Sequence, residues 1–358
     1  MKQTRSDQTC RLSPVIEDIG GWKHVLGALA SAQSLSREHA KIAMATILRG
    51  EATPAQIAAF IVALRLKGET SDELGGMVEA MVEAADGITV PEHTIDIVGA
   101  GGSPFRRRHA MNVSTMACFV ASAAGASVCK HGNRKASSTS GSFDVLEALG
   151  VNIDLDSAGV ERCVADAGIG FAFARAHHPA MRFAAPVRAE LGIPTVFNIL
   201  GPISHPGQVT RQVMGVASES TGDLIAQVLA DRGVRAMVVT GDDDLDEFSL
   251  TGPSRVLDVA DGSITPMQVA PSDVGMQQCV EADLVGGDAA TNADITKAIF
   301  SGREQGARRD IVVLNAAAGL VVAGLADDLG AGVKKAGEAI DNGSAAATLD
   351  RLIEVSNA

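Results

Sequence analysis

"TIDIVGAGGSPFRRRHAMNVSTMACFVASAAGASVCKHG", residues 94–132, contains the pattern from which the rest of the chain can be interpreted. It reads as a short apolar strand, a glycine-rich turn, an apolar helix that begins near Asn112, and a second strand that ends in Lys130, His131 and Gly132. Alternating strands and helices are typical of an α/β domain, in which ligands bind at the carboxyl ends of the strands. We therefore expect a central, mostly parallel sheet with a ligand site at its carboxyl edge.

The alternation continues downstream of this stretch. "RAMVVTG" (residues 235–241) reads as another strand followed by an acidic loop, and "SRVLDVADGSITPMQV" (residues 254–269) reads as a hairpin around Asp261 and Gly262. Each of the loops singled out below follows a strand, so we expect them to converge.

Upstream of residue 90 the pattern is purely helical. Helices are expected over "SREHAKIAMATILRG" (36–50), over "TPAQIAAFIVALRLKG" (53–68) and after "TSDEL" (70–74), the last two each opened by a capping box. We expect a flexible tail over residues 1–20, a small helical domain over 21–90 that forms a dimer interface, and an α/β domain over 91–358.

The composition is that of a globular protein with an acidic surface. Of 358 residues, 46% are apolar, and 43 acidic residues outweigh 30 basic ones to give a net charge of −13. A surface of this sign disfavours nucleic acid and anionic membranes as partners. The five cysteines show no paired spacing, the N-terminus lacks an apolar leader core, and the apolar "VVLNAAAGLVVAGLA" (312–326) is short and contains Asn and Gly, so we expect a cytoplasmic protein.

The glycine turn of the opening stretch is suited to binding phosphate. Its glycines allow close approach of the backbone, and Asn112, Ser114 and Thr115 lie where a helix begins, so that free N–H groups and the helix dipole favour an anion. An ordinary glycine turn with polar caps has the same letters, so the turn alone does not establish a site.

Three further segments carry chemistry. "KHGNRKASSTSGS" (130–142) places cationic and hydroxyl side chains at the end of an apolar strand, before a helix, and reads as a second anion site. "GDDDLDEFSLTGPSR" (241–255) contains Asp246 and Glu247, whose carboxylates suit Mg²⁺ that shares substrate phosphates, although a solvated acidic turn is the common fate of such a run. In the segment 174–202, Arg188 suits a carboxylate, while His178 and Pro179 are equally compatible with a capped turn.

Together these segments resemble the anthranilate phosphoribosyltransferase family. The motifs are "KHGNRKASSTSGSFDVLEALGV", "AHHPAM", "APVRAELGIPTVFNILGP" and "LDEFSLTGP", in the family's order, and "AQIAAFIVALRLKGET" resembles its helical domain. The resemblance implies transfer of the ribosyl 5-phosphate of phosphoribosyl pyrophosphate (PRPP) to the amino group of anthranilate, with Mg²⁺ as cofactor and a homodimer as assembly. Two alternatives are a same-fold transferase for another aromatic amine or base and a low-activity or non-catalytic paralogue that binds nucleic acid.

The resemblance also implies roles for individual residues. It implies catalytic roles for Lys130, His131 and Arg188. It implies that PRPP is bound by Gly99, Gly101, Gly102, Ser103, Asn112, Ser114, Thr115, Lys130 and Ser142. Anthranilate would lie against Gly99, Gly132, Asn133, His178 and Arg188, and Mg²⁺ would be held by Ser114, Asp246 and Glu247.

The glycine turn departs from the family pattern, which is G-T-G-G-D, a short spacer and T-x-N-[IVL]-S-T. Here Ala100, Ser103 and Ala110 replace the first Thr, the Asp and the later Thr, and the spacer is longer. We hypothesise that the three arginines at 106–108 compensate for the lost carboxylate position by contacting PRPP phosphates, whereas a solvated loop tip is the alternative. Replacement of all three by Ala with an unchanged dissociation constant for PRPP would contradict the hypothesis.

Overall fold

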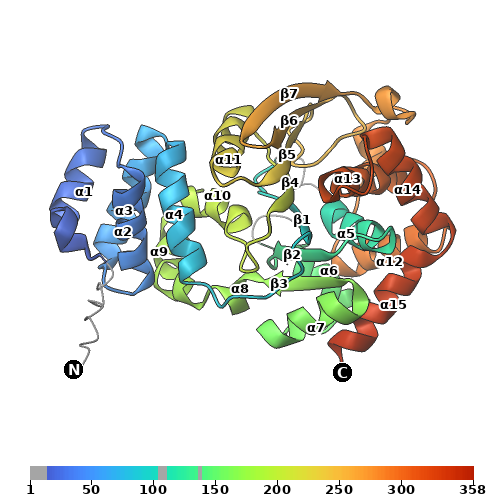
Figure 1. The fold of residues 1–358 in the computed structure, drawn as a ribbon, viewed down its shortest axis with the longest axis horizontal. Helices are drawn as coiled ribbons and strands as arrows, with labels where there is room; N and C mark the ends of the chain where they lie inside the picture. The colour runs from blue at the N-terminus through green and yellow to red at the C-terminus, as the bar shows by residue number, and fades with distance from the viewer. Residues whose placement is uncertain (1–13, 104–110, 136–138) are drawn as a thin grey trace, which may run out of the picture.

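The computed structural model describes residues 14–103, 111–135 and 139–358 (Figure 1). A helical N-terminal region lies beside a larger domain built on a mostly parallel sheet, which confirms the expected fold class. The N-terminal region consists of the 3-10 helix η1 (Ile16–Ile19) and helices α1 (Gly21–Ala30), α2 (Arg37–Leu48), α3 (Pro54–Lys67) and α4 (Ser71–Glu83).

The capping signals place the helices of this region correctly. Thr53 and Gln56 form the capping box of α3, and Thr70 and Glu73 form that of α4. Helix α1 has no capping signal in the sequence, because it begins after Gly20 in the left-handed conformation, without a side-chain cap. Ile16 of η1 is buried, so the chain packs against the bundle earlier than the tail expected to residue 20.

The sheet has the order β3-β2-β1-β4-β5-β6-β7. Its strands are β1 (Ile95–Gly99), β2 (Val128–Gly132), β3 (Ile169–Phe173), β4 (Arg211–Gly215), β5 (Arg235–Gly241), β6 (Ser254–Ala260) and β7 (Ser263–Val269). The first five in this order are parallel, and β6 and β7 form the expected antiparallel hairpin. Asp261 and Gly262 both have positive φ, as a two-residue hairpin turn requires.

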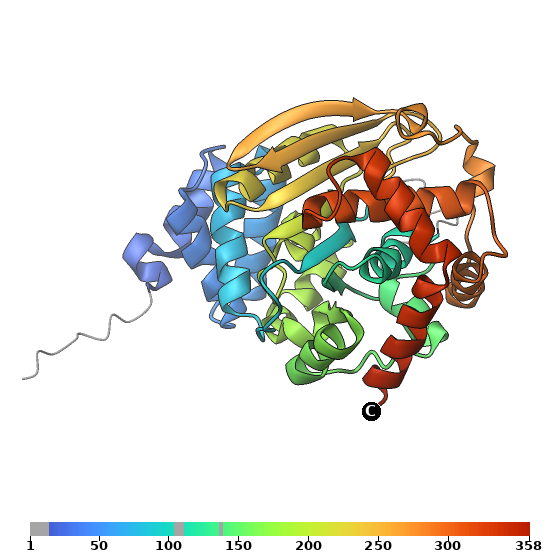
Figure 2. The same cartoon turned by 45° about the vertical axis from the view of Figure 1, so that its right-hand side comes forward.

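Helices cover both faces of this sheet. The remaining helices of the described chain, some of which pack on other helices rather than on the sheet, are α5 (Val113–Ala123), α6 (Ser142–Leu149), α7 (Ser157–Ala167), α8 (Ala174–His177), η3 (Pro179–Phe183), α9 (Ala185–Leu191), α10 (Val196–Ile203), α11 (Glu219–Asp231), η4 (Pro271–Val274), η5 (Glu281–Leu284), α12 (Ala289–Phe300), α13 (Ala307–Ala323), α14 (Leu329–Asp341) and α15 (Ser344–Ser356). The blue N-terminal helices lie at the left and the red C-terminal helices at the right of Figure 1, and the turned view of Figure 2 brings the red helices to the front. In the parts of the chain that the structure describes, no helix combines the length and apolarity needed to cross a membrane.

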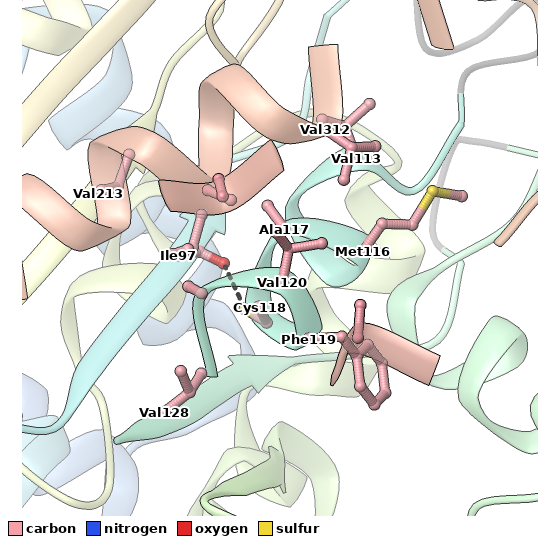
Figure 3. Close-up of a cluster of buried hydrophobic side chains, with 14 of the residues drawn as sticks. Ile97, Val113, Met116, Ala117, Cys118, Phe119, Val120, Val128, Val213 and Val312 are labelled. Carbon is pink, nitrogen blue, oxygen red and sulfur yellow. Dashed lines mark hydrogen bonds between the residues drawn. The ribbon is translucent and has the colours of Figure 1, made fainter. Parts of the chain in front are cut away.

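Helix α5 is held tightly between the sheet and α13 (Figure 3). Its residues Met116, Ala117 and Phe119 are fully buried. The Cys118 thiol, also on α5, faces the carbonyl oxygen of Ile97 in β1 at 3.9 Å. On α13, a Cβ at Gly319 would lie 2.6 Å from Ile97 Cδ1, so glycine at this position lets α13 approach β1 without displacing the Ile97 side chain. This packing fixes the start of α5 at the carboxyl end of β1.

The chain leaves neighbouring strands β1 and β4 toward opposite faces of the sheet. Helix α5, which follows β1, packs into the hydrophobic core on one face, whereas α11, which follows β4, packs into the core shared with the N-terminal helices. The carboxyl ends of β1 and β4 therefore flank a topological switch point, where open α/β sheets bind their ligands.

Candidate active site

The glycine turn and the acidic loop meet at this switch point. The backbone N–H of Gly101 donates to Asp246 Oδ2 at 2.9 Å, and the backbone N–H of Ser114 donates to Glu247 Oε1 at 3.1 Å. A Cβ at Gly99 would collide with Asp246 Oδ2, and one at Gly215 would collide with the Asp246 backbone. The glycines at the ends of both strands are therefore what allows the acidic loop to lie across them.

Only part of the acidic run is directed into the site. Asp246 and Glu247 are buried, while Asp243 accepts hydrogen bonds from Ser249 and Thr251 within its own turn, and Asp244 is exposed with a positive φ. Carboxylate and hydroxyl oxygens are the donors that Mg²⁺ prefers, so Asp246, Glu247 and Ser114 fit a magnesium ion chemically. Among the described residues no three His, Cys, Asp or Glu side chains converge as a metal-binding group. An ion held here would therefore take further oxygens from water or ligand.

The start of α5 is lined by buried polar side chains. Asn112 is its N-cap residue, and Ser114 and Thr115 lie in its first turn. Gly101 and Gly102 have φ values of 75° and 88°, which glycine adopts without strain. Ser103, which stands where the resembled family has Asp, is 1% exposed, and its hydroxyl has no hydrogen-bond partner in the described ranges. Arg106, Arg107 and Arg108 lie outside the described residues.

The loop after β2 reaches the same place from the other side. Asn112 Nδ2 donates to the carbonyl oxygen of Ser140 at 3.2 Å, which joins this loop to the start of α5. Ser142 Oγ donates to the carbonyl oxygen of Asn133 at 3.1 Å, and a Cβ at Gly132 would collide with Ser142 Oγ.

Arg134 is turned away from this junction. Its guanidinium forms ion pairs with Asp144 and Glu147 of α6, so its positive charge is already paired with two carboxylates on that helix.

Lys130 is buried below the loops. Its ammonium group donates to the carbonyl oxygen of Ile97 at 2.6 Å and lies near the carboxylate of Asp96. Burial raises the pKa of Asp96 to about 7, although the charge of Lys130 opposes the shift. Asp96 was not singled out from the sequence, but a carboxylate inside the apolar strand "TIDIV" is the signal that could have found it.

Three histidines form a buried, neutral cluster beside the end of β2. The ring of His131 lies 5.2 Å from that of His178 and 5.7 Å from that of His205. Burial lowers the pKa of His178 to about 4, that of His205 to about 3, and that of His131 well below its usual value. His205 Nδ1 accepts from the backbone N–H of Gly207, so its Nε2–H donates to the carbonyl oxygen of Cys129.

Arg188 is a cation on helix α9. It is half-buried on α9, its guanidinium lies 5.2 Å from the centroid of the Phe197 ring, and burial lowers its pKa. Within the described ranges the guanidinium has no ion pair. Such a group suits a planar carboxylate that can accept two parallel hydrogen bonds.

Hydrogen bonds therefore join the glycine turn, the start of α5, the acidic pair (Asp246 and Glu247) and the described end of the serine-rich loop after β2 (residues 139–142). His131 and His178 form a second group, and Arg188 stands separately on α9. Sequence reasoning missed Asp96, His205, Asn292 and Asn315. The lone Asn315 in the apolar helix α13 was a readable signal, because it bonds both backbone groups of Phe248, next to Glu247. Asn292 had no such signal.

Glycine turns, a helix N-terminus and buried carboxylates at a switch point define a class of α/β protein that binds a phosphate-bearing ligand. Comparison with known proteins identifies the family. Residues 91–346 match the a/b domain of the glycosyl transferase family, and residues 23–85 match its helical bundle domain. The chain belongs to this family.

Two relatives and two solved structures show how similar this chain is to proteins of known name. The anthranilate phosphoribosyltransferase of Chloroflexus aggregans is 48% identical over 93% of this chain and 98% of that protein, and that of Arthrobacter sp. is 46% identical over 93% and 95%. The crystal structure of the Thermus thermophilus enzyme matches with a TM-score of 0.88 and 39% identity, covering 93% of this chain and 99% of that one. The Saccharomyces cerevisiae enzyme in complex with PRPP and Mg matches with a TM-score of 0.85 and 27% identity, over 94% and 98%.

Proposed function

We propose that this protein is an anthranilate phosphoribosyltransferase that transfers the phosphoribosyl group of PRPP to the amino group of anthranilate in tryptophan biosynthesis, with release of pyrophosphate. The observation that carries the proposal is the junction of the acidic pair with Gly101 and the start of α5, in a chain 48% identical to enzymes of this name. The other reactions considered from the sequence are not favoured.

The donor half of the site is proposed to hold PRPP. The backbone N–H groups of the glycine turn and of α5, apart from those of Gly101 and Ser114 that donate to the acidic pair, are suited to its phosphates, together with the side chains of Asn112, Ser114, Thr115, Ser142 and Lys130. In the transition state positive charge develops on the ribose and negative charge grows on the departing pyrophosphate. Fixed N–H dipoles stabilise that negative charge without reorganising, so the residues act through position and electrostatics.

Mg²⁺ is the cofactor of the reaction, and Asp246, Glu247 and Ser114 are the residues proposed to hold it. When bound, the ion neutralises charge on the pyrophosphate oxygens. The buried carboxylates keep their oxygens directed at the start of α5, which supports this assignment because the phosphates are proposed to lie at the same point.

The acceptor half is proposed to hold anthranilate. Arg188 would bind its carboxylate, and the neutral rings of His131 and His178 with Gly132 and Asn133 would face the aromatic ring and amine. An aryl amine is unprotonated at neutral pH, so its lone pair attacks C1 of the ribose without a strong base. Neutral histidines support this role, since a cationic ring would compete with Arg188 for the carboxylate.

The test uses the loss of anthranilate fluorescence when protein, PRPP, Mg²⁺ and anthranilate are mixed. We expect decay that requires all four components. A folded protein that leaves the fluorescence unchanged would refute the proposed function.

Two further proposals concern assembly and location. We propose a homodimer formed through the helical region, where Leu66 of α3 is 82% exposed, and sedimentation velocity of the purified chain tests it. We also propose a cytoplasmic location, since its buried free thiols Cys118, Cys129 and Cys163 suit a reducing compartment. Fractionation of cells that express the chain tests the location.

A further inference from the structure

Asn292, on α12, is a fully buried polar residue at the junction of three loops. Its exposed fraction is 0%, and it is 180 positions from its partner Asn112. Neither the chemistry proposed above nor any motif of the sequence gives it a role. Its contacts nevertheless reach the start of α5 and, through Asn112, the serine-rich loop.

The hydrogen bonds around Asn292 form a series in which each donor-to-acceptor step runs the same way, from Gly287 to Ser140. The backbone N–H of Gly287 donates to Asn292 Oδ1 at 2.8 Å, and Asn292 Nδ2 donates to Asn112 Oδ1 at 2.8 Å. Asn112 Nδ2 then donates to the carbonyl oxygen of Ser140 at 3.2 Å.

Backbone groups set the direction of this series. The N–H of Gly287 can only donate, and the carbonyl of Ser140 can only accept, so both amides between them have one permitted orientation. A further hydrogen bond joins the loop after β2 to the same glycine, since Thr139 Oγ1 donates to the carbonyl oxygen of Gly287 at 3.0 Å.

We infer that Asn292 is a positioning residue for PRPP: it fixes the amide of Asn112, and through it the backbone at Ser140, in the orientation that binds the donor substrate. The inference rests on the proposed function, because the donor role of Asn112 is part of that proposal. Asn112 is only 4% exposed, so a reversed amide would leave its oxygen facing the Ser140 carbonyl without water to relieve the contact.

Asn292→Asp is the sharpest variant. The ionised carboxylate has the shape of the amide and still accepts from the Gly287 N–H, but it cannot donate to Asn112 or to the Gly287 carbonyl oxygen, to which Asn292 Nδ2 donates at 3.3 Å. We expect the KM for PRPP to rise about tenfold, with the KM for anthranilate and kcat changed less than about twofold. Thr296→Val is the matched control: Thr296 is equally buried one turn further along α12, and its hydroxyl donates to the backbone carbonyl of Asn292, its one partner among the described residues. This control should retain the wild-type KM for PRPP.

A double-variant cycle keeps the test valid if Asn292→Asp folds poorly. Asn292→Ala, Asn112→Ala and the double variant are compared by titration calorimetry with PRPP and Mg²⁺, after circular dichroism has verified folding. We expect the double variant to bind PRPP as weakly as Asn112→Ala alone, because both residues act through one series of hydrogen bonds. Additive losses, or a rise in both KM values after Asn292→Asp, would overturn the inference. Failure of the wild-type protein to bind PRPP would instead refute the proposed function.

Discussion

The two halves of the site are organised by different forces. In the proposed donor half, the side chains of Asn112, Asp246 and Glu247 are hydrogen-bonded to backbone groups of other segments, namely those of Ser140, Gly101 and Ser114. In the acceptor half, the Nε2 atoms of His131 and His178 have no hydrogen-bond partner in the described ranges, and Arg188 is held by packing on a ring.

The difference follows from what each half is proposed to bind. A pyrophosphate is highly charged, and a set of fixed dipoles stabilises it at little reorganisation cost. An aromatic acid is planar and mostly apolar, so it needs a shaped pocket with a few open polar atoms. Variants should therefore separate the two halves kinetically.

The largest effect is expected from the acidic pair. Asp246→Asn removes a buried negative charge proposed to hold Mg²⁺, and we expect kcat/KM for PRPP to fall about 100- to 1,000-fold. Asp244→Asn is the matched control, because it removes an exposed carboxylate from the same run and Asn tolerates a positive φ. The fluorescence assay measures both variants, and equal losses would mean that the charge of the loop matters rather than the position of Asp246.

A smaller and more selective effect is expected from the acceptor half. Arg188→Gln should raise the KM for anthranilate about 10- to 100-fold, since a charged hydrogen-bond donor to the carboxylate is lost, while the KM for PRPP stays the same. Arg182→Gln serves as control, since Arg182 is exposed and lies over Phe183. If both KM values rise together after Arg188→Gln, the division into halves is wrong.

Acidification should destabilise the fold through the histidine cluster. In the native state the pKa of His178 is about 4 and that of His205 is about 3, both below the usual value near 6.5. As the pH falls from about 6.5 to 4, these two rings therefore bind protons in the unfolded chain but stay neutral in the native state, which lowers the free energy of unfolding. Asp96 acts in the opposite direction over about pH 7 to 4, because its pKa is raised to about 7 and the native state binds the extra proton. The histidines outnumber it, so urea midpoints should fall from pH 7 to pH 5.

Variants of these groups sharpen the pH prediction. Asp96→Asn removes the opposing contribution and should make the loss on acidification steeper, whereas His205→Gln should make it shallower. A midpoint that stays constant or rises toward pH 5 in the wild-type protein would contradict the neutral state of the cluster.

The smallest effect is expected far from both halves. Thr53→Ala removes the N-cap of α3 and should cost about 1 kcal/mol of unfolding free energy with unchanged kinetic constants. Urea denaturation and the fluorescence assay measure the two quantities. A change in either KM would show that the helical region influences the site directly.

Much of this arrangement could be predicted from local patterns. Capping boxes located α3 and α4, a two-residue turn located the hairpin, and glycine turns after strands located the ligand edge, because each is a short-range preference of backbone and side chain. Strands β3 and β4 were not identified, since "IGFAF" and "RQVMG" are only five residues each, too short for the periodicity of apolar residues to distinguish a strand from a buried helix.

The sequence by itself determined the α/β class, the segments that meet at the candidate site and, through their resemblance to a family, the expected reaction. Only the tertiary structure decided which residues of each segment meet. Asp246 and Glu247 contact the glycine turn and the start of α5, whereas Asp243 bonds within its own loop. Asn292 reaches Asn112 from a helix in which the sequence shows no motif. The physical reason is that motifs record local backbone preferences, whereas hydrogen bonds between residues 180 positions apart depend on how the sheet order brings its loops together.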